Sequence, residues 1–217
     1  MATHRKWVLG IAMGAALFFL LTACAQALAH FSPPFSCGAD CVPLSLIVRE
    51  ERLSDGAQND LPPLEDGDIL LTDCAHSFGW RHGHAALVLD GRLGLTLEAV
   101  TVGVPSDIQS AQRWRRYPTF TVMRLKNADP VTRRAVAEYA LEHLRQVPYR
   151  LTSGLFDDSL PSELSGSQCA YLVWYAYRQF GYDLDSDGGR LVTVEDLRRS
   201  PYLEVVARVG DPSPANM

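Results

Sequence analysis

Cys169 is the first candidate for nucleophilic chemistry, because it lies near the start of a stretch with helical periodicity. The serines and glycine at 165–167 suit a helix entry, where unpaired backbone N–H groups and the helix dipole favour a thiolate. The residues that share its helix face are Leu172, Val173, Ala176 and Phe180. This face should pack on a sheet. Because a buried Cys is common at such positions, Cys169 alone does not establish an active site.

A general base could come from His84, which begins an otherwise apolar strand where a buried imidazole needs a hydrogen-bonding partner. Strand alternation allows a hairpin to bring His84 and Glu98 together. A two-residue turn at Asp90-Gly91 would send Glu98 to the other side. A three-residue loop, or a bulge at Gly91 or Gly94, would place Glu98 directly opposite His84. The carboxylate would then hold one imidazole nitrogen and leave the other for the thiol.

Strands and helices must position these residues. The apolar runs that predict strands are Asp68–Thr72, Ala85–Leu89, Leu95–Val100 and Phe120–Leu125. We interpret them as an antiparallel meander. Asp129 as N-cap and Pro130 at the first helical position predict a helix that ends before Pro148. A second helix should run from near Ser167 to Gly181.

The N-terminal segment 1–29 has the pattern of an export signal. A basic start is followed by an apolar run from Trp7 to Leu21, which is too short for a comfortable membrane span. Leu21-Thr22-Ala23-Cys24 resembles the lipobox of bacterial lipoproteins, in which the Cys becomes the lipidated first residue. Ala27-Leu28-Ala29 would instead suit an ordinary signal peptidase. We favour Cys24, and therefore expect an exported lipoprotein anchored in the cell envelope.

The composition indicates that the residues after the signal segment form one globular unit. The apolar fraction of 47% and the net charge of -5 are typical of a soluble domain and give no basic face for nucleic acid. The exported chain of about 190 residues is enough for one well-packed domain. Residues 30–66 read as a tether or N-terminal extension, within which Cys37 and Cys41 should pair. Residues 67–217 form the predicted catalytic domain.

Five short motifs follow one another along this domain. They are Gly67-Asp68-Ile69-Leu70, Gly83-His84-Ala85-Ala86-Leu87-Val88, Leu97-Glu98-Ala99, Pro148-Tyr149 and Cys169-Ala170-Tyr171-Leu172-Val173. Together they resemble the YiiX-like branch of the NlpC-type cysteine peptidases, over roughly residues 67–206. The resemblance implies an α+β, circularly permuted papain-like fold. In it the His precedes the Cys, and an antiparallel sheet packs against the Cys-bearing helix.

By this resemblance Cys169 is the nucleophile, His84 the general base and then acid, and Glu98 the third member. Tyr149 would line the substrate pocket. Gln168 could add its side-chain amide to the oxyanion site. The implied reaction is hydrolysis of a peptide or isopeptide bond of cell-wall type through an acyl-enzyme, with no cofactor. Relatives with the same permuted core act on lipid acyl groups, so a lipid acyl hydrolase or acyltransferase is the alternative.

Two groups of residues suggest a metal site instead. The first is Cys74, His76, His82 and His84, which offer ligands for zinc. Their spacing matches no common zinc pattern and leaves Cys169 unexplained. The second is Asp183, Asp185 and Asp187, which resemble the opening of a calcium loop. Val194 stands where that loop needs an acid, so we expect a polar turn and assign no metal. A non-catalytic module that binds wall peptides in a papain-like groove is a further alternative.

The lipobox-like run ending at Cys24 generates a prediction about anchoring. Mass spectrometry of protein from native membranes should find a diacylated Cys24 as the first residue, because lipoprotein processing cleaves immediately before that Cys. The Cys24→Ser variant should lose the acyl mass and leave the membrane fraction. A wild-type chain beginning at His30 would contradict the prediction and indicate ordinary signal-peptidase cleavage.

Overall fold

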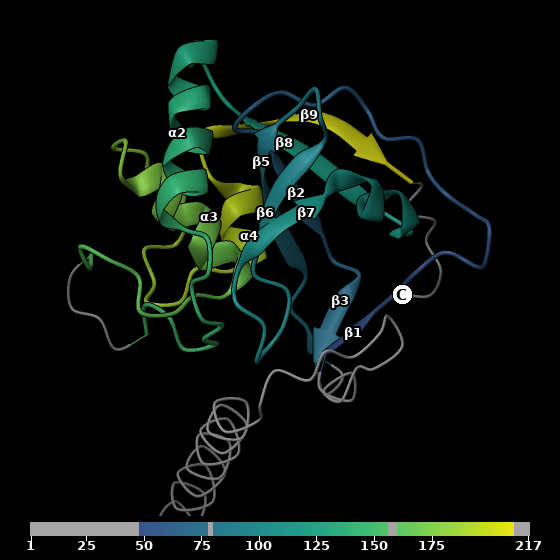
Figure 1. The fold of residues 1–217 in the computed structure, drawn as a ribbon, viewed down its shortest axis with the longest axis horizontal. Helices are drawn as coiled ribbons and strands as arrows, with labels where there is room; N and C mark the ends of the chain where they lie inside the picture. The colour runs from purple at the N-terminus through teal and green to yellow at the C-terminus, as the bar shows by residue number, and fades with distance from the viewer. Residues whose placement is uncertain (1–47, 78–79, 156–159, 211–217) are drawn as a thin grey trace, which may run out of the picture. The chain divides into compact units, whose positions relative to one another are not determined.

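The computed structural model describes residues 48–77, 80–155 and 160–210 (Figure 1). The predicted signal segment, Cys24, and the predicted Cys37–Cys41 pair lie outside the described residues. Within the described ranges, no helix is long and apolar enough to cross a membrane. Residues 42–217 form one compact unit by their contacts, and the fold below is that of its described part.

An antiparallel sheet of six strands forms the centre of this unit, in the order β7-β6-β5-β2-β8-β9. The strands are β2 (Ile69–Thr72), β5 (His84–Asp90), β6 (Leu95–Glu98), β7 (Asp107–Ser110), β8 (Phe120–Leu125) and β9 (Leu203–Val209). The four predicted strands are confirmed to within two residues at each end. The predicted meander is wrong, because β8 pairs with β2 rather than with β6. All residues of β2 are buried, and a strand buried on both faces belongs in the middle of a sheet.

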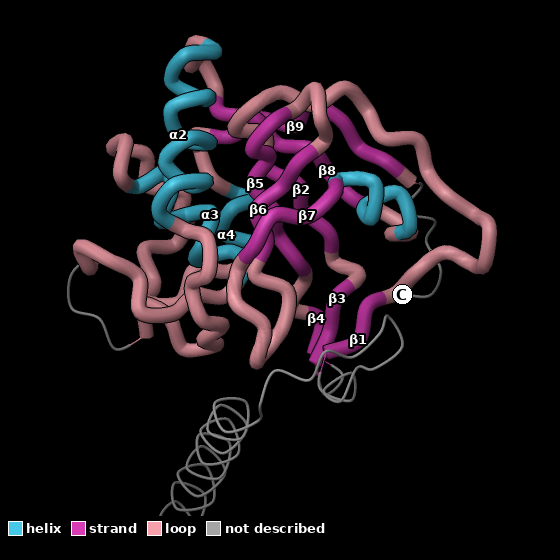
Figure 2. The backbone as a smooth tube through the Cα atoms, viewed as in Figure 1, coloured by secondary structure: helices cyan, strands magenta, loops and turns pink. Residues whose placement is uncertain are grey.

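Helices cover one side of this sheet (Figures 1 and 2). They are α2 (Pro130–His143), α3 (Cys169–Arg178) and α4 (Val194–Arg199). The predicted start of α2 is confirmed, with the Asp129 carboxylate accepting a hydrogen bond of 2.7 Å from the Thr132 N–H. α2 ends at His143, earlier than the predicted stop at Pro148, and the α3 helix is shorter than predicted at both ends.

Two hydrophobic clusters lie on the two faces of the sheet. Ala85 and Leu87 of β5 point into the cluster beneath α2 and α3, whereas Ala86 and Val88 point into the cluster on the opposite face. The short 3-10 helix η1 (Ala111–Arg116) covers that opposite face. The predicted helix face of α3 is confirmed except at Phe180, which lies beyond the end of α3 and is 36% exposed.

The described part of the predicted tether or extension packs on the domain. Strand β1 (Val48–Glu50) pairs with β3 (Ala75–Ser77), which pairs with β4 (Trp80–Arg81), so that these strands form a second, three-stranded sheet. Leu61 and Leu64 pack against the cluster under η1. The described residues 48–66 therefore pack on this part of the structure, because Leu61 and Leu64 add apolar surface to its second cluster.

Gly83 holds the turn that leads from β4 into β5 and therefore sets where His84 begins. Its φ of 74° is left-handed, and an added Cβ would lie 2.6 Å from the Thr72 carbonyl oxygen. We expect Gly83→Ala to lower the free energy of unfolding by more than about 2 kcal/mol, the sum of left-handed strain and crowding. Gly56→Ala is the matched control, because Gly56 has a φ of 82° with nothing within 4 Å. Equal losses for both variants, measured by denaturant titration, would contradict the role of crowding.

Candidate functional site

His84 is the first residue of β5 and is buried. Its Nε2 lies 2.8 Å from the Oε2 atom of Glu98 in β6, which is the contact predicted from strand alternation. Its ring stacks on the indole of Trp114 in η1, with centroids 5.6 Å apart and an interplanar angle of 18°. The imidazole is therefore fixed both in its plane and along its hydrogen-bonding edge.

The register that joins His84 to Glu98 differs from the predicted one. Leu87 pairs with Leu97 and Asp90 with Leu95, and the register shifts between Val88 and Asp90. The extra residue therefore lies in β5 before the turn, rather than at Gly91 or Gly94. Continuing this register places Glu98 across from Ala86, so that it reaches His84 diagonally rather than from directly opposite. The predicted face is correct, because the one-residue shift in β5 changes the parity of the pairing and so brings Glu98 onto the face of His84.

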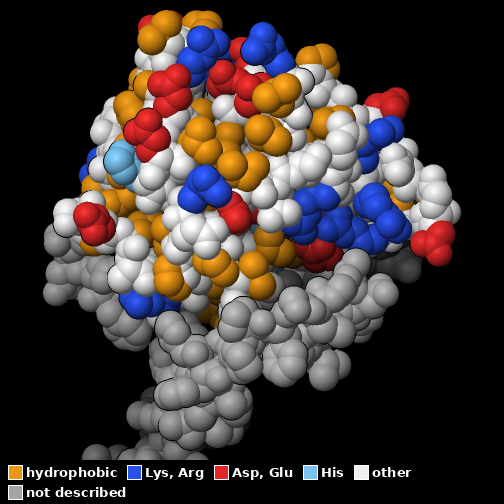
Figure 3. Space-filling view, viewed as in Figure 1, with side chains coloured by type: hydrophobic (Ala, Val, Ile, Leu, Met, Phe, Trp, Pro, Cys, Tyr) orange, Lys and Arg blue, Asp and Glu red, His pale blue; other side chains and the backbone are white. Residues whose placement is uncertain are grey.

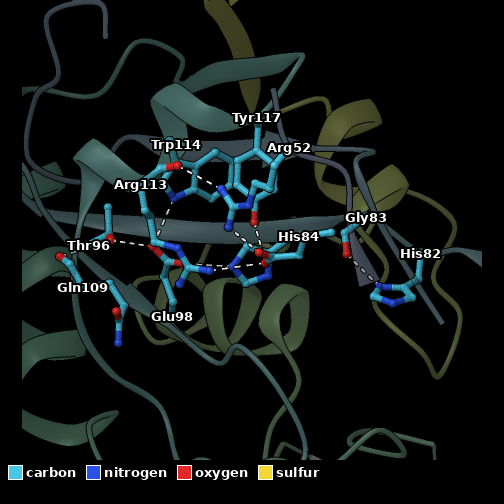
Figure 4. A network of polar contacts seen from close by, with 11 residues as sticks. Arg52, His82, Gly83, His84, Thr96, Glu98, Gln109, Arg113, Trp114 and Tyr117 are labelled. Carbon is cyan, nitrogen blue, oxygen red and sulfur yellow. Dashed lines mark hydrogen bonds and ion pairs between the residues drawn. The ribbon is translucent and has the colours of Figure 1, made fainter. Parts of the chain in front are cut away.

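Glu98 is a fully buried carboxylate surrounded by donors (Figure 4). Besides His84, the donors are Thr96 Oγ1 at 2.7 Å, Trp114 Nε1 at 3.0 Å and Arg113 NH1 at 3.2 Å. Burial by itself would raise the pKa of Glu98, but the hydrogen bond and charge of His84, aided by Arg113 and Thr96, lower that pKa to about 2. The carboxylate therefore stays ionised at any physiological pH.

Cys169 is the first residue of α3 and is buried beside His84. Burial would lower the pKa of His84, but hydrogen bonds and charge from Cys169 and Glu98 outweigh it and raise that pKa to about 10. Because Glu98 uses Nε2, the other ring nitrogen is left for the thiol. The structure thus brings together the nucleophile, base and carboxylate predicted from the sequence. A thiol and an imidazole in contact can form a thiolate–imidazolium pair.

Tyr149 and Gln168, predicted to contact substrate, lie next to the nucleophile in different settings. Tyr149 forms a parallel bridge with Ser167, and burial together with the nearby Cys169 raises the pKa of its phenol above the ordinary range. Gln168 is the N-cap of α3: its side-chain oxygen accepts from the Ala170 N–H at 2.7 Å, and its Nε2 donates to the Val192 carbonyl at 2.6 Å. The amide of Gln168 thus holds the start of the helix that carries Cys169.

Several residues of the site were not predicted from the sequence. They are Glu50, Thr96, Arg113 and Trp114. Thr96 lies two residues before Glu98 on the same strand face, so alternation could have identified it. Arg113 and Trp114 come from η1, and Glu50 comes from the N-terminal extension. No local pattern places these distant segments beside β6, so they required the tertiary structure.

Of the two metal sites considered from the sequence, the structure separates the zinc ligands but brings two of the three calcium-like aspartates together. The zinc ligands are not assembled: Cys74 Sγ contacts Thr119, and His82 Nδ1 lies 2.7 Å from the Gly83 carbonyl. Among the described residues, the one group of three ligand atoms within 4.8 Å of one another is Asp185, Asp187 and Asp196. Asp196 forms the capping box of α4 with Thr193. Asp185 and Asp187 accept backbone N–H groups of their own loop.

Comparison with known proteins identifies a fold. No described protein family and no curated protein matches the sequence. A structural search matches the crystal structure of metalloprotein YiiX from Escherichia coli O157:H7 (DUF1105), with a TM-score of 0.52 and 14% sequence identity. The match covers 69% of this chain and 100% of the other chain. The chain has a YiiX-like fold. The predicted YiiX-like arrangement, with an antiparallel sheet and packed helices, is therefore confirmed at the level of the fold.

The buried His84–Glu98 pair generates a prediction about stability and pH. The lowered pKa of Glu98 contributes stability that is complete above its ordinary value of 4.5 and is lost as the pH falls to about 2. The raised pKa of His84 contributes stability that is complete below its ordinary value of 6.5 and is lost as the pH rises through about 10. We expect the free energy of unfolding to be highest between those two ordinary values.

Glu98→Gln should remove most of this pH dependence. The variant should lose about 3 kcal/mol inside that window, because His84 and Arg113 lose their buried counter-charge. The loss should shrink toward both extremes of pH. Denaturant titrations of both proteins across the pH range measure it, with the exposed Glu142→Gln as control. A difference between wild type and Glu98→Gln that does not change with pH would contradict the assignment.

Proposed function

We propose that the protein is a cysteine hydrolase that cleaves an amide bond through an acyl-enzyme on Cys169. The single observation that carries the proposal is the hydrogen-bonded series of Cys169, His84 and the buried Glu98. A thiol at a helix start, a base in contact with it and a third group that orients the base form the arrangement required for nucleophilic catalysis.

The proposed reaction has two steps. The Cys169 thiolate attacks the carbonyl carbon of the substrate, and the oxyanion is stabilised by the backbone N–H of Cys169 at the start of α3. The tetrahedral intermediate collapses as His84 gives its proton to the leaving amine, leaving a thioester. Water then attacks the thioester while His84 takes a proton from it, and the acid product leaves with Cys169 restored. Glu98 orients His84 throughout and makes or breaks no bond.

The order of the site residues supports an NlpC-type assignment with a circularly permuted papain-like fold. In ordinary papain-like proteins the Cys-bearing helix precedes the strands that hold the His. Here His84 begins β5 and Cys169 begins α3, much later in the chain. The likeness to YiiX supports the fold. The peptidase chemistry rests on the Cys169 site.

The substrate class follows from the proposed location. An exported protein anchored through Cys24 would meet peptides and isopeptides of the cell wall, which are amides with accessible carbonyl groups. The same thioester chemistry acts on lipid acyl esters, so an acyl hydrolase or acyltransferase is the second candidate. A screen of wall peptides and acyl esters with the full chain distinguishes the two candidates.

YiiX from E. coli is called a metalloprotein, which raises the question of whether the site residues of this chain would fit a metal. Cys169 and one nitrogen of His84 could supply two ligands, but His84 Nε2 is occupied by Glu98. The described chain brings no third His, Cys, Asp or Glu ligand atom into a close group with them. The site therefore does not fit a metal in this arrangement, and no step of the proposed reaction uses one.

Thiol reactivity tests the proposal independently of any substrate. Iodoacetamide should alkylate Cys169 at least tenfold faster than Cys74, because His84 stabilises the thiolate of Cys169 alone. Once a substrate is identified, Cys169→Ala and His84→Ala should each lower kcat/KM about 10³-fold or more.

Cys74→Ser is the matched control, because Cys74 is also buried but contacts Thr119 rather than the His84 network. It should keep wild-type activity. Peptide mass mapping measures each alkylation rate. Faster reaction at Cys74, together with full activity of Cys169→Ala, would overturn the mechanism.

A further inference from the structure

A chain of alternating charges continues beyond the proposed site. Arg113 donates from NH1 to Glu98 at 3.2 Å and from NH2 to Glu50 Oε1 at 3.3 Å. Tyr117 also donates its hydroxyl to Glu50, at 2.7 Å. Arg52 pairs with the same carboxylate and stacks over the Tyr117 ring, its guanidinium carbon 3.9 Å from the centroid. The carboxylate that orients His84 is thus the start of a longer network (Figure 4).

We propose that Arg113 and Glu50 are positioning residues of the Cys169 site: Glu50 holds Arg113 against Glu98, and Arg113 keeps Glu98 oriented and charged while His84 changes protonation. The catalytic meaning of this proposal rests on the proposed function. The effect of the charges of Arg113 and Glu50 on the Cys169–His84 pair can be tested without any substrate.

The reaction cycle gives Arg113 a specific task. When His84 hands its proton to the leaving group, the imidazole becomes neutral and Glu98 loses its cationic partner. A fully buried carboxylate with no positive charge nearby would tend to take up a proton itself. Arg113 remains in contact with Glu98 at that moment, so the carboxylate stays ionised and His84 can accept the next proton.

Glu50 has the complementary task. An uncompensated Arg113 would repel the imidazolium form of His84, although its positive charge would favour the thiolate of Cys169. Glu50 neutralises that repulsion from the side away from Glu98. Burial raises the pKa of Glu50, but the hydrogen bond from Tyr117 and the charges of Arg113, Arg52 and His84 together lower it. The two residues therefore act on the pair with opposite signs, which a purely structural role would not produce.

The N-terminal extension delivers Glu50 to this position. Glu50 pairs with Ala75 across β1 and β3, and the next residue, Glu51, donates its N–H to the Cys74 carbonyl at 2.7 Å. The extension also packs on η1, where the Leu53 N–H donates to the Arg116 carbonyl at 2.8 Å. The segment that leads to the predicted membrane anchor thus contributes a charged group to the site.

Other charged groups near His84 must be kept constant in any test. Besides Glu50 and Arg113, the groups that interact with the pair are His82 and Glu98, which act on His84, and Tyr149, which lies near Cys169. The variants below leave all of them in place. The measurement is the rate of Cys169 alkylation by iodoacetamide as a function of pH, using the full chain. The midpoint of the rise of this rate with pH is the quantity compared between the variants.

Arg113→Met should raise this midpoint by about 1 pH unit, because a positive charge that stabilises the thiolate through the network is lost. Below the midpoint, the alkylation rate should fall about tenfold. Glu50→Gln should move the midpoint in the opposite direction, because it removes a negative charge. Arg113→Lys keeps the charge and should restore most of the wild-type midpoint even if Arg113→Met folds poorly.

Arg116→Met is the matched control. Arg116 belongs to the same 3-10 helix and pairs with the exposed Asp55 at 3.6 Å, away from Glu98. Basic side chains gather on the right of Figure 3. Arg113 and Arg116 both lie in the last turn of η1, so the control removes a charge of the same kind from the same helix. Its midpoint should equal that of the wild type.

Three outcomes decide the proposal. It is overturned if Arg113→Met and Arg116→Met behave alike in folded protein. It is also overturned if Glu50→Gln shifts the midpoint in the same direction as Arg113→Met, which would indicate loosening of the structure rather than a charge effect. If the opposite shifts appear but no amide or ester is hydrolysed, the network is established and the proposed hydrolase function fails by itself.

Discussion

A carboxylate removed completely from water must find donors and positive charge inside the protein, and Glu98 is such a carboxylate. Its two oxygens are satisfied by an imidazole, an indole, a hydroxyl and a guanidinium. These donors come from β5, η1 and the strand of Glu98 itself. The packing of η1 against β5 and β6 brings these donors together. Without any one of them, a buried charge would be left partly unsatisfied.

Trp114, one of the donors to Glu98, also fixes the orientation of His84. Its indole N–H donates to Glu98, while its ring stacks on His84 and packs edge-on against Tyr117 and Phe120. One fully buried side chain therefore fixes the carboxylate and the plane of the base at once. For the proposed reaction, this restriction of both rotamers would leave less ordering to be done when a substrate binds.

The sequence predicted those parts of the structure that depend on short-range patterns. The strands around Ile69, Ala85, Leu95 and Phe120, and the capped start of α2 at Asp129, have clear local signals. The shared face of His84 and Glu98 was one of two outcomes that the sequence allowed, because it required an extra residue in the hairpin, which the structure places in β5. Which residue forms the bulge, and the pairing of β8 with β2, depend on the competition among non-local contacts that no local window contains.

The contributions of residues 48–66 and η1 to the site could likewise not be predicted from the local sequence. Residues 48–66 have the composition of a tether, and the sequence around Arg113 has no functional motif. Both become part of the site only because the second face of the sheet needs a cover, which Leu61, Leu64 and Trp114 supply. The burial of apolar surface thus determines where the charged residues of these segments are placed.

The position of His84 at the very start of its strand resolves a geometric conflict. Its side chain has the parity of Ala86, which faces the cluster under η1, whereas Cys169 belongs to the cluster on the helix side. In the middle of the sheet the backbone would separate the two groups. At the strand end, next to the left-handed Gly83, the imidazole can contact both Glu98 on one side and the start of α3 on the other. In an interior strand such as β5, the strand end is where one side chain can contact groups on both faces of the sheet, and His84 occupies that end.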